Sequence, residues 1–202
     1  MVLHAMTWTM KSVTFTVLMV QVALAASGCA GHHTAARAVP PLTEAGHGLS
    51  VRLPQGWHRA TVNLTPHLTD PREELSVATF PLRYRPGPCA QFPVSAIAQL
   101  GPRDALVTLQ ERGVDPGYSW PDFPQRPTAF GPRLGGEADV RGCVPHARFT
   151  DHWFGFTDSG RHFHVLVVFG LDAPVAVRAQ AWRILDSLRV NPRVRPDWRA
   201  TP

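Results

Sequence analysis

Histidine and aspartate side chains gather in one part of the sequence and are the first candidates for chemistry. They lie between positions 146 and 164: His146, Asp151, His152, Asp158, His162 and His164. In an extended strand, His162 and His164 would project from one face, where a pair of imidazoles can chelate a metal ion. The hairpin pairing expected here places His152 on the opposite face and His164 against Trp153, which favours packing over metal binding. We therefore predict no metal site, and His162 and His164 are the residues that a bound metal would use.

Motifs that would mark a hydrolase or a nucleotide-binding enzyme are absent from the sequence. It contains no GxSxG, HExxH or SxxK pattern and no glycine-rich phosphate loop between a strand and a helix. Ser159 falls in an expected turn between strands rather than at a strand-to-helix elbow, so it is a poor candidate nucleophile. The adjacent carboxylates Glu73 and Glu74 are expected to be solvated in a loop. The sequence predicts a non-catalytic protein without a cofactor.

Cys29 ends an apolar segment near the N-terminus. Residues 12–26 carry no charge and follow Lys11. Their length is that of a signal peptide's apolar region and falls short of the roughly 20 residues that span a bilayer. The stretch from Leu24 to Cys29 resembles the lipobox of bacterial lipoproteins, with Ala26 standing where that family prefers leucine.

This resemblance implies that residues 1–28 are removed and that Cys29 carries a diacylglyceryl thioether. The two acyl chains would anchor the protein stably in a membrane. The protein would then lie on the outer face of the cytoplasmic membrane, facing the periplasm where an outer membrane is present. The alternatives are a secretory signal peptide cut near Ala25 and Ala26, or an uncleaved anchor.

The charge of the chain is modest and is carried by arginine. The formal net charge is +5, and Lys11 is the only lysine. Arginine without lysine, among abundant alanine, proline and glycine, indicates the codon bias of a GC-rich genome. A small, dispersed positive charge suits an anionic membrane surface and does not indicate nucleic-acid binding.

Two cysteines remain once Cys29 is assigned to lipid. Cys89 and Cys143 are 54 residues apart, and an even pair in an oxidising compartment favours one structural disulfide. The alternative is two free thiols. A redox or metal role would need CxxC-like spacing, which the sequence lacks.

The remaining chain predicts an α+β fold, a mostly antiparallel sheet with helices packed on it. Residues 29–45 are expected to be a flexible tether, 46–189 a single domain and 190–202 a basic, proline-rich tail. Strands are expected at 48–54, 58–64, 75–80, 137–143, 147–156 and 161–169, and helices at 93–100, 102–112 and 173–187. Asp172 is expected to cap the last helix.

The last two expected strands form a hairpin with Asp158 and Ser159 at its tip. That tip pairs Phe156 with Arg161 and Phe154 with Phe163. One face then carries mainly Phe154, Phe163, Val165, Val167 and Phe169, and the other carries Trp153, His162, His164, Leu166 and Val168. Both faces are partly apolar, which predicts a sheet covered on both sides.

Residues 114–136 form a long segment rich in proline and glycine. Its aromatic and basic side chains could line a patch for a partner or a ligand: Trp120, Phe123, Arg126, Phe130 and Arg133. The alternative is that they anchor the segment on the sheet.

Both ends of the domain resemble PsbP-like domains of bacterial lipoproteins. The first end is the sequence from Gly48 to Trp57, and the second combines Gly160 to Val165 with Ile184 to Leu188. The resemblance implies an α-β-α sandwich, a role in binding or assembly, and no shared catalytic residues. The function predicted from the sequence is therefore a membrane-anchored, extracytoplasmic binding or assembly module. Its partner would be another cell-envelope protein or a small ligand. The alternative is a small metal-binding protein or enzyme that uses His146, His152, His162 and His164.

Overall fold

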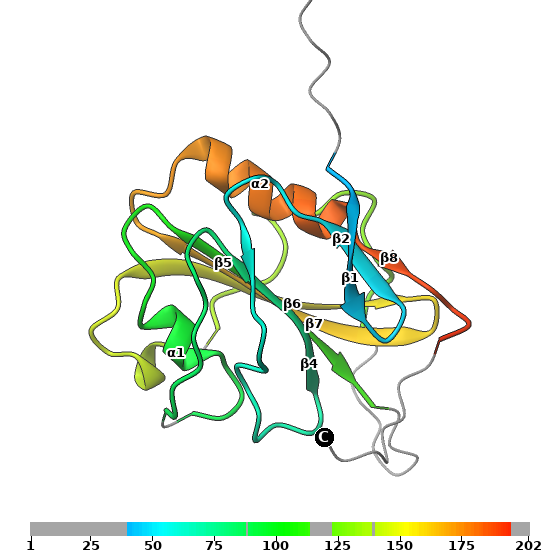
Figure 1. The fold of residues 1–202 in the computed structure, drawn as a ribbon, viewed down its shortest axis with the longest axis horizontal. Helices are drawn as coiled ribbons and strands as arrows, with labels where there is room; N and C mark the ends of the chain where they lie inside the picture. The colour runs from blue at the N-terminus through cyan, green and yellow to red at the C-terminus, as the bar shows by residue number, and fades with distance from the viewer. Residues whose placement is uncertain (1–39, 88, 114–122, 139, 195–202) are drawn as a thin grey trace, which may run out of the picture. The chain divides into compact units, whose positions relative to one another are not determined.

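The computed structural model describes residues 40–87, 89–113, 123–138 and 140–194 (Figure 1). Cys29, Trp120, most of the predicted tether and the end of the predicted tail lie outside these ranges. The described part is built of antiparallel sheets with few helices, which confirms the predicted α+β class. None of its helices is long and apolar enough to cross a membrane.

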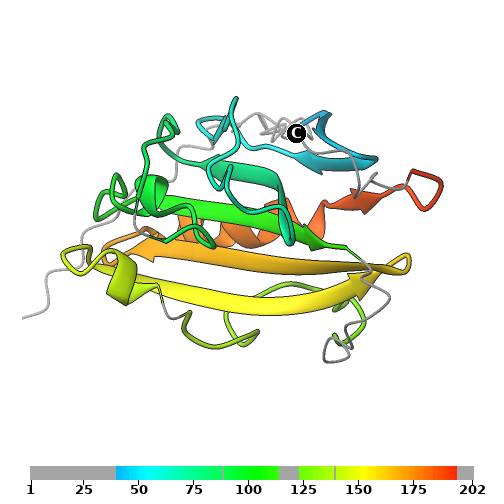
Figure 2. The same ribbon diagram turned by 90° about the horizontal axis from the view of Figure 1, so that it is seen from below.

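The larger sheet has five strands in the order β3-β4-β5-β7-β6, all neighbours antiparallel (Figure 2). Its strands are β3 (His58–Arg59), β4 (Arg72–Ala78), β5 (Ala105–Arg112), β6 (Phe149–Asp158) and β7 (Arg161–Gly170). The central strands β5 and β7 are buried along nearly their whole length. Burial on both faces explains the apolar run from Val165 to Phe169 in β7, because a strand covered on both faces needs no polar alternation. Strand β5 also buries Thr108, Gln110 and Glu111.

The prediction of a helix over residues 102–112 is wrong, since this segment contains the central strand β5. Leu, Gln, Glu and Arg are good helix formers, and that intrinsic preference led to the error. In the sheet, Val107 and Leu109 lie in the core on one face while Leu106 packs in the core on the other. Burial on both faces by non-local partners overrides the local preference.

A smaller, three-stranded sheet has the order β1-β2-β8. It consists of β1 (Leu42–Gly46), β2 (Leu49–Arg52) and β8 (Arg189–Val190). The tether was therefore predicted too long at its C-terminal end, and the predicted tail begins inside β8. The turn between β1 and β2 needs left-handed backbone at three successive residues, and Gly46, His47 and Gly48 have φ of 115°, 45° and 75°.

Helix α2 (Val175–Asp186) lies on one face of the large sheet (Figure 1) and confirms the helix predicted for 173–187. The side chains of Ala181, Ile184 and Leu185 enter one core with the smaller sheet. Trp182 also enters this core. The predicted cap is wrong, because the N-cap residue is Pro174 and no side chain caps the helix.

The other face of the large sheet is covered by irregular chain from two regions, which we call the cover: residues 89–97 and 140–147. It contains the one-turn helix α1 (Val94–Ile97) and the short 3-10 helix η1 (Arg141–Cys143). The strand predicted for 137–143 is therefore wrong, and the helix predicted for 93–100 is shorter than expected. A disulfide joins Cys89 to Cys143, with their Cα atoms 5.9 Å apart, and links the two regions of the cover.

The hairpin of β6 and β7 pairs Asp158 with Arg161 and Phe156 with Phe163. The predicted pairing is wrong by two residues, because the tip is formed by Ser159 and Gly160. Both have positive φ, which suits the two-residue turns that match strand twist. A shift of two residues keeps each side chain on its face, so the predicted division into two faces is confirmed.

The three remaining predicted strands are found with altered bounds. Strand β2 lies inside the predicted 48–54, and β3 keeps only the first two residues of the predicted 58–64. Strand β4 begins three residues before the predicted 75–80. That earlier start brings Glu73 and Glu74 into the sheet.

Candidate functional site

The four histidines proposed as an alternative metal or catalytic site do not converge. His146 is exposed in a loop. His152 lies on the α2 face, with its ring centroid 5.2 Å from that of Trp182. His162 and His164 lie on the opposite face. Among the described residues, no group of three or more His, Cys, Asp or Glu side chains could hold a metal ion.

His164 is used for packing and for one hydrogen bond. Its ring stacks on Trp153, with centroids 4.8 Å apart, and its Nε2 accepts a hydrogen bond from Nε of Arg112. Burial and the neighbouring Arg112 charge lower the pKa of His164 to about 4. The imidazole is therefore neutral at physiological pH.

The aromatic residues of the predicted patch pack inward. The Phe123 ring contacts the His164 ring edge-on, with centroids 4.7 Å apart. Phe130 is buried and contacts Phe156, with centroids 5.3 Å apart. These contacts fit the alternative in which the aromatic residues anchor the long segment on the sheet.

Arg126 also serves as an anchor. It forms an ion pair with Asp158 and donates to three carbonyl oxygens at the end of α2, those of residues 185, 186 and 188. A cation is favoured at that end of a helix. Backbone hydrogen bonds from this segment to Trp153 and Thr157 also cover the outer edge of β6. Arg133 is exposed, and Trp120 lies outside the described residues.

A polar cavity of about 220 Å³ lies between the β1–β2 hairpin, the chain that follows β3, and strand β4. Its polar lining includes His47, Arg59, Asn63, Glu73, Glu74 and Ser76. Strand β3 is only two residues long, and the amide of Ala60 makes one more hydrogen bond to the Ser76 carbonyl oxygen of β4. The chain then leaves β4, and the cavity forms beside the edge of the sheet. Carboxylates, an imidazole and a guanidinium meet in this cavity, which makes it the candidate site.

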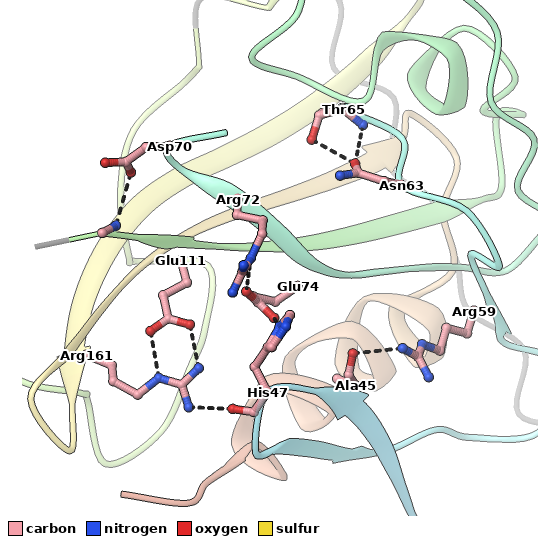
Figure 3. A network of polar contacts seen from close by, with 11 residues as sticks. Ala45, His47, Arg59, Asn63, Thr65, Asp70, Arg72, Glu74, Glu111 and Arg161 are labelled. Atoms are coloured by element: carbon pink, nitrogen blue, oxygen red, sulfur yellow. Dashed lines mark hydrogen bonds and ion pairs between the residues drawn. The ribbon is translucent and has the colours of Figure 1, made fainter. Parts of the chain in front are cut away.

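A β-bulge in β4 positions the first of the carboxylates. The pairing with β5 shifts between Glu73 and Leu75, so Glu74 is the extra residue. Its side chain is 1% exposed and accepts hydrogen bonds from Nε of Arg72, at 3.0 Å, and from Nδ1 of His47, at 2.7 Å (Figure 3). The His47 imidazole is 46% exposed, so one end of it contacts a buried carboxylate and the other faces solvent.

A second buried ion pair lies beneath the tip of the β1–β2 hairpin. The side chains of Glu111 and Arg161 are 2% and 1% exposed, and the guanidinium donates to both carboxylate oxygens (Figure 3). A third donor, Nη1 of Arg161, bonds to the carbonyl oxygen of His47 at 2.9 Å. The backbone and the side chain of His47 are thus both held by charged groups of the large sheet. Burial raises the pKa of Glu111 despite these donors.

The second carboxylate of the cavity, Glu73, has a different environment. Its Oε2 accepts hydrogen bonds from the Leu64 amide and the Thr65 hydroxyl, both at 3.0 Å. Among the described residues, no cationic side chain forms an ion pair with Glu73. Burial raises its pKa, and the neutral donors offset that effect only in part.

Sequence reasoning missed this site. Glu73 and Glu74 were expected to be solvated, whereas the structure places both in β4 against the cavity and buries the Glu74 side chain. His47 was not singled out at all. The only available indication was two acidic residues beside a run that continues as a strand, Leu75 to Phe80. Compared with known proteins, the chain matches no family model and shows no significant similarity to a curated protein.

Proposed function

We propose that this chain is a lipid-anchored, extracytoplasmic binding module, and that its polar cavity binds a small ligand through a compact cationic group. The observation that carries the proposal is the Glu73 carboxylate, which lines the cavity and has only neutral hydrogen-bond partners among the described residues. Glu73 is partly buried. A carboxylate that is partly desolvated and lacks a countercharge is unfavourable, and a bound cation would supply that charge.

The other charges of the cavity leave Glu73 as the group to which a cation would bind. Both oxygens of Glu74 are engaged, by Arg72 and by His47. Arg59 donates to the carbonyl oxygen of Ala45, at 2.7 Å. A cavity of about 220 Å³ is smaller than the roughly 300–1,000 Å³ of drug-sized sites. The ligand, or the part of it that enters, therefore has the size of an alkylammonium group.

The proposed location of the protein, anchored outside the cytoplasm, rests on features of the sequence. The resemblance to a lipobox supports a lipid on Cys29, and one disulfide between Cys89 and Cys143 suits an oxidising compartment. The antiparallel sheets with few helices are compatible with an α+β class. The resemblance of both ends of the domain to PsbP-like domains supports a binding or assembly role. The four histidines give no support to the alternative function, because in the described part of the chain they do not form a common site.

An NMR titration tests the cavity with three probes of equal length: n-butylammonium, n-butanol and butyrate. We expect saturable shifts of backbone amides in residues 60–63 and 73–76 with n-butylammonium alone, at millimolar affinity, about −4 kcal/mol. Glu73→Gln should weaken this binding about tenfold or more. Glu137→Gln is the matched control, because that carboxylate is 76% exposed and distant in the sequence from the cavity lining. Equal shifts with butanol, or unchanged binding in Glu73→Gln, would refute the ligand class.

A separate measurement tests the anchor. The wild-type chain and Cys29→Ser are made in a bacterium that processes lipoproteins, and intact mass and detergent-phase partition are recorded. We expect a diacylglyceryl adduct on Cys29 and partition into detergent for the wild type alone. An unlipidated wild-type chain would refute the anchor and leave the cavity proposal standing.

A further inference from the structure

Several buried polar atoms lie on the cover side of the large sheet without a hydrogen-bond partner. Within the described part of the chain, four side-chain atoms have this property: Ser95 Oγ, Gln110 Oε1, Asp151 Oδ1 and His164 Nδ1. Buried polar atoms in native proteins almost always have a partner, and ordered water supplies it where protein atoms do not. These atoms are therefore candidates for hydrogen bonds to ordered water.

Two of the four atoms belong to residues that face each other. Gln110 of β5 and His164 of β7 are directly opposed in the antiparallel pairing. Opposed side chains project from the same face, with Cβ atoms about 4.5–5.5 Å apart. Gln110 is 1% exposed and His164 is 9% exposed. No hydrogen bond joins Gln110 Oε1 to His164 Nδ1 directly.

The other hydrogen bonds of Gln110 and His164 determine whether each unpartnered atom is a donor or an acceptor. Nε2 of His164 accepts from Arg112, so in the neutral ring the proton lies on Nδ1. Nε2 of Gln110 donates to the carbonyl oxygen of Gln91, at 3.1 Å, which sets the orientation of the amide. The pair therefore presents one N–H donor and one carbonyl acceptor on neighbouring side chains.

We infer that one buried water molecule is bound between Gln110 and His164, accepting from Nδ1–H and donating to Oε1. Side chains opposed across two strands lie close enough for one molecule of this size to contact both. A water molecule is the smallest group that both accepts and donates, whereas an ion would leave one of the two atoms unsatisfied. The Trp153 and Phe123 rings, packed on His164, shield this position from solvent.

The bound water has a structural consequence. It connects β5 to β7 on the cover side, and through the Gln110 amide it connects both strands to Gln91 in the cover. It also holds the proton of His164 on Nδ1, which keeps the Nε2 lone pair directed at Arg112. Both effects concern packing of the cover and are independent of the cavity at Glu73.

A crystal structure at high resolution tests the inference on the full folded chain. We expect a water peak within hydrogen-bond distance of both Gln110 Oε1 and His164 Nδ1. In Gln110→Met, which keeps the length of the side chain and removes the acceptor, the peak should be lost. A direct Nδ1–Oε1 hydrogen bond, or an empty gap between the two side chains, would overturn the inference.

NMR gives a second measurement that needs no variant. The Nδ1–H proton of His164 should be observable and should show a cross-peak to a long-lived water. His162 is the matched control, because its Nδ1 lies 3.4 Å from the Thr157 hydroxyl instead. Absence of the Nδ1–H tautomer at His164 would also overturn the inference.

Discussion

Replacing Arg161 by methionine would leave the Glu111 carboxylate buried without its countercharge. The change removes two hydrogen bonds to Glu111 and a third to the carbonyl oxygen of His47, in a site where both side chains are at most 2% exposed. Breaking a buried ion pair by removing one partner costs about 3–5 kcal/mol of unfolding free energy. For a protein of this size, each kcal/mol lowers Tm by about 2–4 °C, so we expect a fall of roughly 6–20 °C.

A double-mutant cycle in urea measures the coupling. The three variants are Arg161→Met, Glu111→Met and the combination of both. Each single variant should lose several kcal/mol, and the double variant should lose less than their sum, because no buried charge remains uncompensated in it. Glu137→Gln serves as the control. It disrupts a surface pair with side chains 76% and 54% exposed, and its expected effect is below about 1 kcal/mol.

Two results would refute this reasoning. If Arg161→Met lost less than about 1 kcal/mol, the carboxylate would have another source of stabilisation. If the losses of the two single variants simply added, the residues would act independently. In the expected case, the amide signal of His47 should also shift in NMR spectra of Arg161→Met, because Arg161 bonds to the tip of the β1–β2 hairpin.

Three further predictions concern other parts of the structure. Burial raises the pKa of Glu73, so the folded state holds a proton more tightly than the unfolded state. The unfolding free energy should then fall as pH rises from about 4.5 through the raised pKa, and Glu73→Gln should reduce the slope measured by urea unfolding at several pH values. Reducing the Cys89–Cys143 disulfide, which closes a 54-residue loop, should cost about 4 kcal/mol, measured by urea unfolding with and without reductant. Gly170→Ala should lower stability by about 1–3 kcal/mol in thermal melts, because a methyl group there would collide with the backbone oxygen atoms of Gly101 and Pro102.

The sequence alone was enough to determine elements whose pattern is local. The helix predicted for 173–187 reappears as α2, with one apolar face in the core, and the alternation in β6 and β7 reappears as two separate cores. Turn residues placed the hairpin to within two residues, an even error that preserves the faces. These features are encoded by neighbours along the chain, so they can be recognised without knowing the rest of the fold.

Strand β5 shows where local information fails. Its residues suit a helix, and its identity as a strand depends on β4 and β7, which bond to its two edges. Residues 137–143 show the opposite case, since they alternate like a strand but contain a 3-10 turn whose last residue is tied by the disulfide. In both segments, partners distant in sequence decide the backbone conformation.

The candidate site was decided by the tertiary structure. The ion pairs join Glu74 to His47, 27 residues away, and Glu111 to Arg161, 50 residues away. The bulge at Glu74 and the early departure of the chain from β4, just after the short strand β3, then open the cavity beside them. The sequence shows which charged residues the chain contains, but only strand order and register determine which of those residues are buried together. Burial in turn determines their chemistry, because desolvation strengthens each charge interaction and makes a missing partner costly.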